Sequence, residues 1–196
     1  VPAGAGGSRD EGGYTGPSAD RRPRPTAMLR FTLTFTGLLL GLFTLSLLPP
    51  VERTVVEPFT SILAQVCTAL VSLFDGNALT EGRVIRTLDG SFGISIERGC
   101  NGIEAMIVLA AGVLAFPATW RQRLAGLAIG FVAIQALNIV RIISLFYLGQ
   151  WSMTAFEWFH LYIWQALIIL DALVVWLLWL RYLGRPRPLP AAPALA

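Results

Sequence analysis

The stretch LAGLAIGFVAIQALNIVRIISLFYL, residues 124–148, decides the class of fold. It is mostly apolar, and a helix of this length at 1.5 Å rise per residue covers about 37 Å, more than the roughly 30 Å hydrocarbon core of a bilayer. Near its second half lies Arg141, a charge that is costly inside a membrane and needs a partner. The stretch therefore predicts a transmembrane helix with one strongly polar site.

The remainder of the chain repeats this apolar pattern. Hydrophobic residues make up 55% of the 196 residues and charged residues 14%, a composition typical of membrane proteins. Further apolar runs at Phe31–Leu48, Ile103–Phe116 and Leu161–Leu180 approach or exceed the length of a span. We therefore expect an all-α integral membrane bundle of about four transmembrane helices. The sequence has no clustered basic face of the kind that binds nucleic acid, so we expect no nucleic-acid role. Because it contains one histidine, we expect neither a metal site nor a cofactor.

Residues 55–74 form a fifth apolar segment, but it carries a polar stripe. At 100° per residue, its polar side chains share one side of the helix, which favours an amphipathic helix at the membrane interface. They are Glu57, Ser61, Gln65, Thr68 and Ser72.

The arginine distribution supports this interpretation. If residues 55–74 do not span, ten arginines lie on the inner side and four on the outer side, as the positive-inside rule favours. The inner set is Arg9, Arg21, Arg22, Arg24, Arg30, Arg121, Arg123, Arg181, Arg185 and Arg187, and the outer set is Arg53, Arg83, Arg86 and Arg98. Both termini are then expected to be cytoplasmic, with residues 49–99 and 149–160 outside.

Composition divides the chain into three segments. Residues 1–27 lack apolar periodicity and predict a disordered tail, residues 28–183 a membrane domain, and residues 184–196 a Pro-rich cytoplasmic tail. Met28, directly before the first apolar run, is a candidate translation start. Two β-prone runs, 83–88 and 92–96, flank Asp89-Gly90 and predict a short extracytoplasmic hairpin that leads into Cys100.

Three chemically capable residues fall at one predicted depth: Cys100, Arg141 and His160, the only histidine. A cysteine near a helix N-terminus and cationic groups is a candidate nucleophile. A histidine is a candidate general acid or base, and an arginine is a candidate hydrogen-bond donor to an oxyanion. Each also has a structural interpretation: a buried thiol or a disulfide with Cys67, an interfacial histidine, and an ion pair between Arg141 and Glu104. The coincidence of all three favours the catalytic alternative.

Other polar residues receive supporting roles. Asn138 lies one helical turn before Arg141 and can orient it, whereas Gln135, Gln165 and Asp171 suit hydrogen bonds between helices. Cys67 lies on the apolar side of its helix and is expected to be structural.

The segments 97–104 (ERGCNGIE) and 138–142 (NIVRI), followed by His160 near a helix start, resemble the exosortase/archaeosortase family over about residues 28–183. The short chain and the segment 100–106 (CNGIEAM) are most like its exosortase H subgroup. The family's commonest motif has a small residue after the cysteine, where Asn101 stands here.

The resemblance implies a membrane cysteine protease or transpeptidase in the bacterial inner membrane, with its active site at the outer, periplasmic face. Cys100, Arg141 and His160 would be catalytic, with Asn101, Glu104 and Asn138 in support. The implied substrates are exported proteins with a C-terminal sorting signal, consisting of a short motif of the Ile-Pro-Thr-Leu kind, a transmembrane helix and a basic tail. Membrane lipid would surround the enzyme. The resemblance does not identify the nucleophile that accepts the acyl group.

Two alternatives from other classes remain open at this point. One is a non-enzymatic transporter or assembly subunit in which Arg141 and Glu104 form a structural pair. The other is a scaffold with a disulfide between Cys67 and Cys100. Replacing Cys100 with alanine would be harmless in the first, and the second would contain no free thiol.

Overall fold

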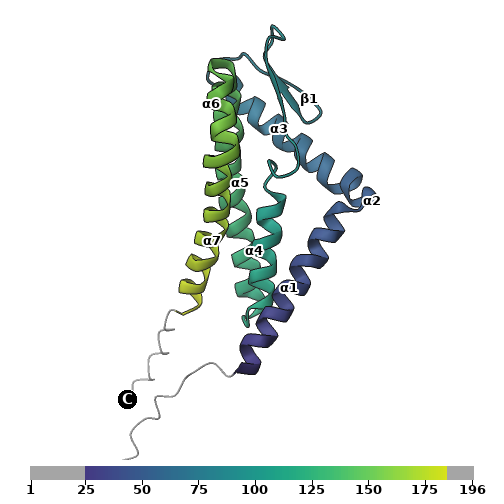
Figure 1. The fold of residues 1–196 in the computed structure, drawn as a ribbon, viewed down its shortest axis with the longest axis vertical. Helices are drawn as coiled ribbons and strands as arrows, with labels where there is room; N and C mark the ends of the chain where they lie inside the picture. Colours follow the sequence, from purple (N-terminus) through teal and green to yellow (C-terminus); the bar gives the residue numbers. More distant parts are fainter. Residues whose placement is uncertain (1–24, 185–196) are drawn as a thin grey trace, which may run out of the picture.

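The computed structural model describes residues 25–184, and most of them are helical (Figure 1). The long helices are α1 (Pro25–Leu47), α3 (Glu57–Ser72), α5 (Trp120–Trp151) and α7 (Trp164–Leu183), with the shorter α4 (Ile103–Ala115) among them. Short segments α2 (Pro49–Val51) and η1 (Glu52–Val56) precede α3, and α6 (Met153–Trp158) and η2 (Phe159–Ile163) precede α7. The first turn of α1 lies within the range predicted as a tail, and the rest of the two predicted tails lies outside the described residues, apart from Gly184.

Four helices in residues 25–184 are long and apolar enough to cross a membrane, as predicted, which makes this a multi-pass membrane protein. By length and composition they are Thr26–Leu47, Pro49–Ser72, Trp120–Trp151 and Met153–Leu183. The predicted span at Ile103–Phe116 is shorter: α4 has 13 residues, or about 20 Å of rise. It stops at Phe116 because Pro117 follows and disfavours helical backbone in the residue before it.

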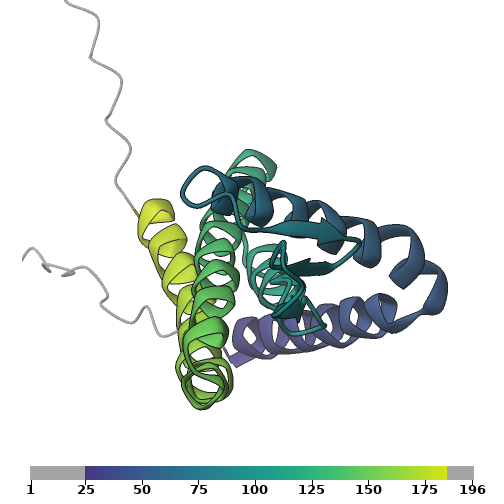
Figure 2. The same ribbon diagram turned by 90° about the horizontal axis from the view of Figure 1, so that it is seen from above.

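The α3 helix meets the length criterion, but it lies obliquely across one end of the bundle instead of alongside α5 and α7 (Figures 1 and 2). Its buried side faces the protein, and the predicted polar stripe lies beside that face, with exposed or half-buried side chains. Exposed apolar side chains, including Ile62 and Val66, occupy the remaining side. The buried side comprises Thr60, Leu63, Ala64, Cys67 and Val71. Because Pro49–Ser72 is itself long and apolar enough to cross a membrane, the interfacial position of α3 stays a prediction, whereas Cys67 lies on the buried side as expected.

The short α4 is the central helix of the bundle and packs against α1, α5 and α7. Its residues Leu109 and Val113 join Ile134 of α5 and Ala172, Val175 and Trp179 of α7 in one buried cluster. Glycines on α5 bring the helices close: the backbone of Gly126 lies against the indole of Trp179, and that of Gly130 against Leu109. Small residues at such contacts are typical of helix packing in membranes.

A small antiparallel sheet covers the end of the bundle next to α3. Strand β2 (Val84–Arg86) pairs with β3 (Gly93–Ser95), with Ile85 opposite Ile94, which confirms the predicted hairpin. The turn contains Gly90 at φ +70°, a conformation that glycine adopts without strain. The sequence did not reveal a third strand, β1 (Leu79–Glu81), which pairs with the other edge of β2. The sheet packs on α3 and α5 through Ile85, Ile96 and Phe146.

The last helical segment begins earlier than predicted. The apolar run suggested a start near residue 161, but α6 begins at Met153, where the Ser152 hydroxyl accepts a hydrogen bond from the Ala155 N–H at 3.3 Å. The π-helical turn η2 then connects α6 to α7. His160 therefore lies in the second turn of a nearly continuous helix and not at its start.

We predict that Gly126→Ala destabilises the bundle. A Cβ at this position would lie 2.5 Å from Nε1 of Trp179, whose indole is held by a 2.9 Å hydrogen bond to the Gln122 carbonyl and cannot easily move. Overpacking of this kind costs about 1–3 kcal/mol. Thermal unfolding in detergent should show a lower Tm for Gly126→Ala. Gly37→Ala is the matched control, since nothing lies within 4 Å of its Cβ; equal Tm values for both variants would contradict the packing described here.

Candidate active site

The loop 97–102 connects β3 to α4 and carries Cys100. The Cys100 N–H donates to the Glu97 carbonyl at 3.0 Å, which closes a tight turn. Gly99 and Gly102 on either side have φ values of +77° and +78°, a region that side chains rarely tolerate. Cys100 thus precedes α4 by three residues, and the prediction that it opens the helix is wrong because the left-handed conformation of Gly102 delays the helix start to Ile103.

Asn101 holds this loop in place. Its side-chain Oδ1 accepts the Ile103 N–H at 3.1 Å, and its Nδ2 donates to the Thr60 hydroxyl of α3 at 3.1 Å. Its backbone carbonyl accepts from Gln135 of α5 at 3.3 Å. Asn101 is buried, so these bonds satisfy groups that would otherwise be costly to desolvate. They connect the loop to two helices that are distant in sequence.

Arg141 reaches the loop from α5, so the structure brings two of the three predicted catalytic residues into contact. Its guanidinium is buried, with Nη1 donating to the Gly99 carbonyl at 3.0 Å and Nη2 lying 3.5 Å from the Cys100 sulfur. Its Nε has no partner among the described residues. The hydrogen-bond partners of this buried guanidinium are therefore a backbone carbonyl and a thiol.

Glu104 binds the other side of the same glycine. Its Oε1 accepts the Gly99 N–H at 3.0 Å, whereas Oε2 is buried without a partner among residues 25–184. Within that range the ion pairs are Arg83–Glu97, Arg86–Glu81 and Arg98–Glu52. The structural Arg141–Glu104 pair of the non-enzymatic alternative is therefore not formed; the two side chains hold the carbonyl and the N–H of Gly99 instead.

Asn138 does not orient Arg141 as expected. It is fully buried, and neither of its amide atoms has a hydrogen-bond partner in the described part of the chain. The amide lies beside Gly102, where an added Cβ would be 3.5 Å from its Cγ. Asn138 is thus an unpaired polar group directly beneath the reactive loop.

His160 lies in η2, where its ring stacks on Phe156 with centroids 5.6 Å apart and planes 7° from parallel. Its Nδ1 is buried and has no partner among residues 25–184. Arg141 lies ten residues before the end of α5 and His160 eight after Ser152, so by helical rise both are about 12–15 Å below the α5–α6 turn. Their levels match, although no hydrogen bond joins His160 to Cys100 or Arg141 in the described residues.

The charges around Cys100 partly cancel. Burial raises the pKa of its thiol, Arg141 lowers it, and the carboxylates of Glu104 and Glu97 raise it again; the net result is a pKa above the usual range. The resting group is therefore the thiol, which needs a base before it can attack a carbonyl. The thiolate that the sequence favoured is not the resting state, because burial outweighs the single cation.

The disulfide alternative is wrong, because Cys67 and Cys100 are both free. Within residues 25–184, no three His, Cys, Asp or Glu side chains are grouped so as to hold a metal ion. The chemistry open to this site is that of a thiol beside a guanidinium and close to a carboxylate, with an imidazole at a matching depth.

Two contacts of the loop could not be found in the sequence. Arg98 binds both carboxylate oxygens of Glu52, at 3.1 Å and 2.8 Å, and donates to the Ser46 carbonyl at the end of α1. The Thr60 hydroxyl accepts a hydrogen bond from the side chain of Asn101, which lies 41 residues later in the sequence. Residue spacing in the sequence does not indicate contacts between residues this far apart. They form because the fold brings α1, η1 and α3 against the loop.

The charge balance at Cys100 predicts opposite pH shifts in two variants. Arg141→Gln removes the charge that lowers the Cys100 pKa, so the pH midpoint of its alkylation should rise. Glu104→Gln removes a charge that raises this pKa, so the midpoint should fall. The rate of iodoacetamide labelling against pH, corrected with Cys100→Ala, measures both. Arg53→Gln, at an exposed position, is the control. Shifts in the same direction would contradict the described electrostatics.

Comparison with known proteins supplies one match. The sequence model described as "Transmembrane exosortase" (EpsH) matches residues 27–177, well over half of the chain. No curated protein and no solved structure matches the chain. The match covers Cys100, Arg141 and His160 together with the helices that carry them. The chain belongs to the transmembrane exosortase family.

Proposed function

We propose that this exosortase is a cysteine transpeptidase that cleaves C-terminal sorting signals through an acyl-enzyme on Cys100. Family membership implies substrate proteins with such signals. The single observation that carries the assignment of residues is the buried guanidinium of Arg141, which contacts the Cys100 sulfur and the Gly99 carbonyl together. A structural arginine would need no thiol beside it.

Attack begins with deprotonation of the Cys100 thiol. Because its pKa lies above the usual range, a base must take the proton, and the imidazole of His160 is the candidate at the matching depth. The thiolate then attacks the scissile carbonyl carbon, and the carbonyl electron pair moves onto oxygen. Arg141 stabilises negative charge first on sulfur and then on this oxygen.

Collapse of the tetrahedral intermediate breaks the C–N bond. The protonated His160 returns its proton to the leaving amine, and the substrate stays attached to Cys100 as a thioester. An acceptor with an amine or another nucleophilic group then attacks the thioester carbonyl and releases the thiol. If water attacks instead, the product is a carboxylate and the reaction is hydrolysis. Mass spectrometry of the product's new C-terminus separates transfer from hydrolysis.

The substrate class follows from the resemblance of the sequence to exosortase H. The signal would comprise an Ile-Pro-Thr-Leu-type motif, a transmembrane helix and a basic tail. The arginine distribution favours an outer position for the loop 97–102, and we propose that this is the periplasmic face of a bacterial inner membrane, where exported proteins present the motif.

The test is co-expression with a substrate that carries an Ile-Pro-Thr-Leu-type tail, in a host that lacks related enzymes. Cys100→Ala should abolish processing, and Arg141→Gln and His160→Ala should reduce it at least about 100-fold, the scale of lost acid–base or electrostatic catalysis. Arg141→Lys keeps the charge but loses the forked geometry and should give an intermediate rate.

The matched controls are Cys67→Ala and Arg53→Gln, compared at equal membrane levels. Cys67 is fully buried on α3 and Arg53 is exposed. Both should process the substrate normally. Normal processing by Cys100→Ala would show that the cysteine is not the nucleophile and would overturn the proposal.

A further inference from the structure

A groove runs along α4 between α1 and α7, and we name it the α4 groove. It consists of two cavities of about 180 and 410 Å³ that share Val108, Ile169 and Ala172. The first cavity reaches Gly99 and Glu104, and the second continues to Phe31, Gly112 and Trp176. Figure 1 shows α1 and α7 on the two sides of α4. The segment from Gly102 to Gly112 is about 15 Å long by helical rise, about half the thickness of a hydrocarbon core.

The α4 groove is lined by groups that suit another transmembrane helix. Its lining includes the small residue Ala105, which is partly exposed and allows a neighbouring backbone to approach closely, whereas Gly112 is covered by the Trp176 indole and Ala172 is buried. Its walls include exposed apolar side chains: Val108 is 41% exposed, Ile169 64% and Leu173 48%. These side chains face lipid or a partner within the membrane.

The end of the groove next to the loop 97–102 is part of the candidate active site. Gly99 lines it, and the carbonyl of this glycine is held by Arg141. Glu104 lines it as well, with Oε2 buried and unpaired among the described residues. A buried carboxylate oxygen without a donor is costly, and a backbone N–H of an extended peptide would satisfy it. A lipid chain offers no such donor.

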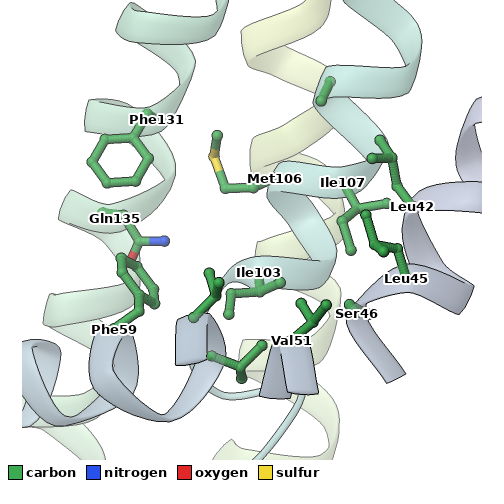
Figure 3. A pocket seen from close by; sticks show the side chains of 13 residues that line it. Leu42, Leu45, Ser46, Val51, Phe59, Ile103, Met106, Ile107, Phe131 and Gln135 are labelled. Atoms are coloured by element: carbon green, nitrogen blue, oxygen red, sulfur yellow. The ribbon is translucent and has the colours of Figure 1, made fainter. Parts of the chain in front are cut away.

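A second apolar pocket lies on another side of α4 and serves as a comparison (Figure 3). Its volume is about 390 Å³, and residues of α1, α2, η1, α3, α4 and α5 line it. Its polar wall residue Gln135 already donates to the Asn101 carbonyl, and neither Gly99 nor Glu104 lines it. No residue of the loop 97–102 lines this pocket.

We propose that the α4 groove receives the transmembrane helix of the sorting signal, and that Glu104 Oε2 accepts a backbone N–H from the extended residues that join this helix to the scissile motif. The inference rests on the proposed function, since it takes the sorting signal as substrate. A helix in this groove has its end beside Gly99, the residue directly before Cys100, so the extended residues that precede the helix meet the reactive loop at Gly99.

Site-specific photocrosslinking tests the location. A benzoyl-phenylalanine probe at Ile169 or Leu173 in the otherwise wild-type sequence should crosslink to the substrate's transmembrane helix. Probes at Phe131 or Leu45, in the pocket of Figure 3, should not. Crosslinks from the second pair alone, or from the groove only to lipid or to another copy of the chain, overturn the proposal.

Blocking the groove provides an independent test. Val108→Trp should fill the junction of the two cavities and lower processing at least tenfold at low substrate levels, with partial recovery when substrate is raised. Cys100 alkylation should not change, because the loop is untouched. Val132→Trp, at a 66% exposed position on α5, is the control and should process normally. Equal processing by both variants overturns the groove assignment.

The two hypotheses fail in different ways. If wild type cleaves the substrate but the crosslinks or the Val108→Trp variant contradict the groove, only the location of the substrate helix is wrong. If Cys100→Ala also cleaves, the proposed function itself is wrong, whatever the crosslinks show.

Discussion

The structure depends on how one buried charge is satisfied. Arg141 lies within a transmembrane helix, where an unpaired guanidinium costs several kcal/mol. Its partners are the Gly99 carbonyl and the Cys100 sulfur, not the carboxylate of Glu104. This pairing fixes the loop 97–102 against α5 and holds the cysteine beside a permanent positive charge. The same contact therefore relieves the cost of burial and assembles the reactive group.

The shortness of α4 makes this contact possible. A full span in this position would carry Cys100 to the surface, beyond the reach of an arginine about 15 Å below the end of α5. Because α4 begins only at Ile103 and contains 13 residues, the loop descends into the end of the bundle. The amphipathic α3 and the sheet then cover the loop, and Asn101 bonds it to Thr60 and Gln135. The result is a half-buried thiol that is protonated at rest.

The sequence predicted the features that depend on local pattern. Long apolar runs predicted three of the four long apolar helices, and Asp89-Gly90 predicted the hairpin. The fourth long apolar helix is Pro49–Ser72, which was predicted to lie at the interface, and the predicted span at 103–116 is the shorter α4. The sequence missed features that arise from tertiary contacts. Strand β1 has three residues and too little alternation to signal a strand, and the start of α6 at Met153 lies before the apolar run that predicted the last helix.

The same distinction applies to the candidate site. Side-chain chemistry and helical depth were enough to connect Cys100 with Arg141. They could not show that Arg141 binds a backbone carbonyl, because any residue supplies one, so Glu104 was the natural partner to expect. They also could not show that Glu104 binds the Gly99 N–H, since that contact requires the left-handed turn at Gly99. The role of His160 as base stays a prediction.

The central claim is that Cys100 forms a covalent bond to the substrate. Its most direct test is mass spectrometry of the purified enzyme, quenched in acid soon after mixing with a sorting-signal substrate. The account predicts an acyl adduct of the substrate on the peptide that contains Cys100, and release of this adduct by hydroxylamine, as expected of a thioester. Cleaved substrate without any adduct on Cys100, or an adduct on another residue, would contradict it.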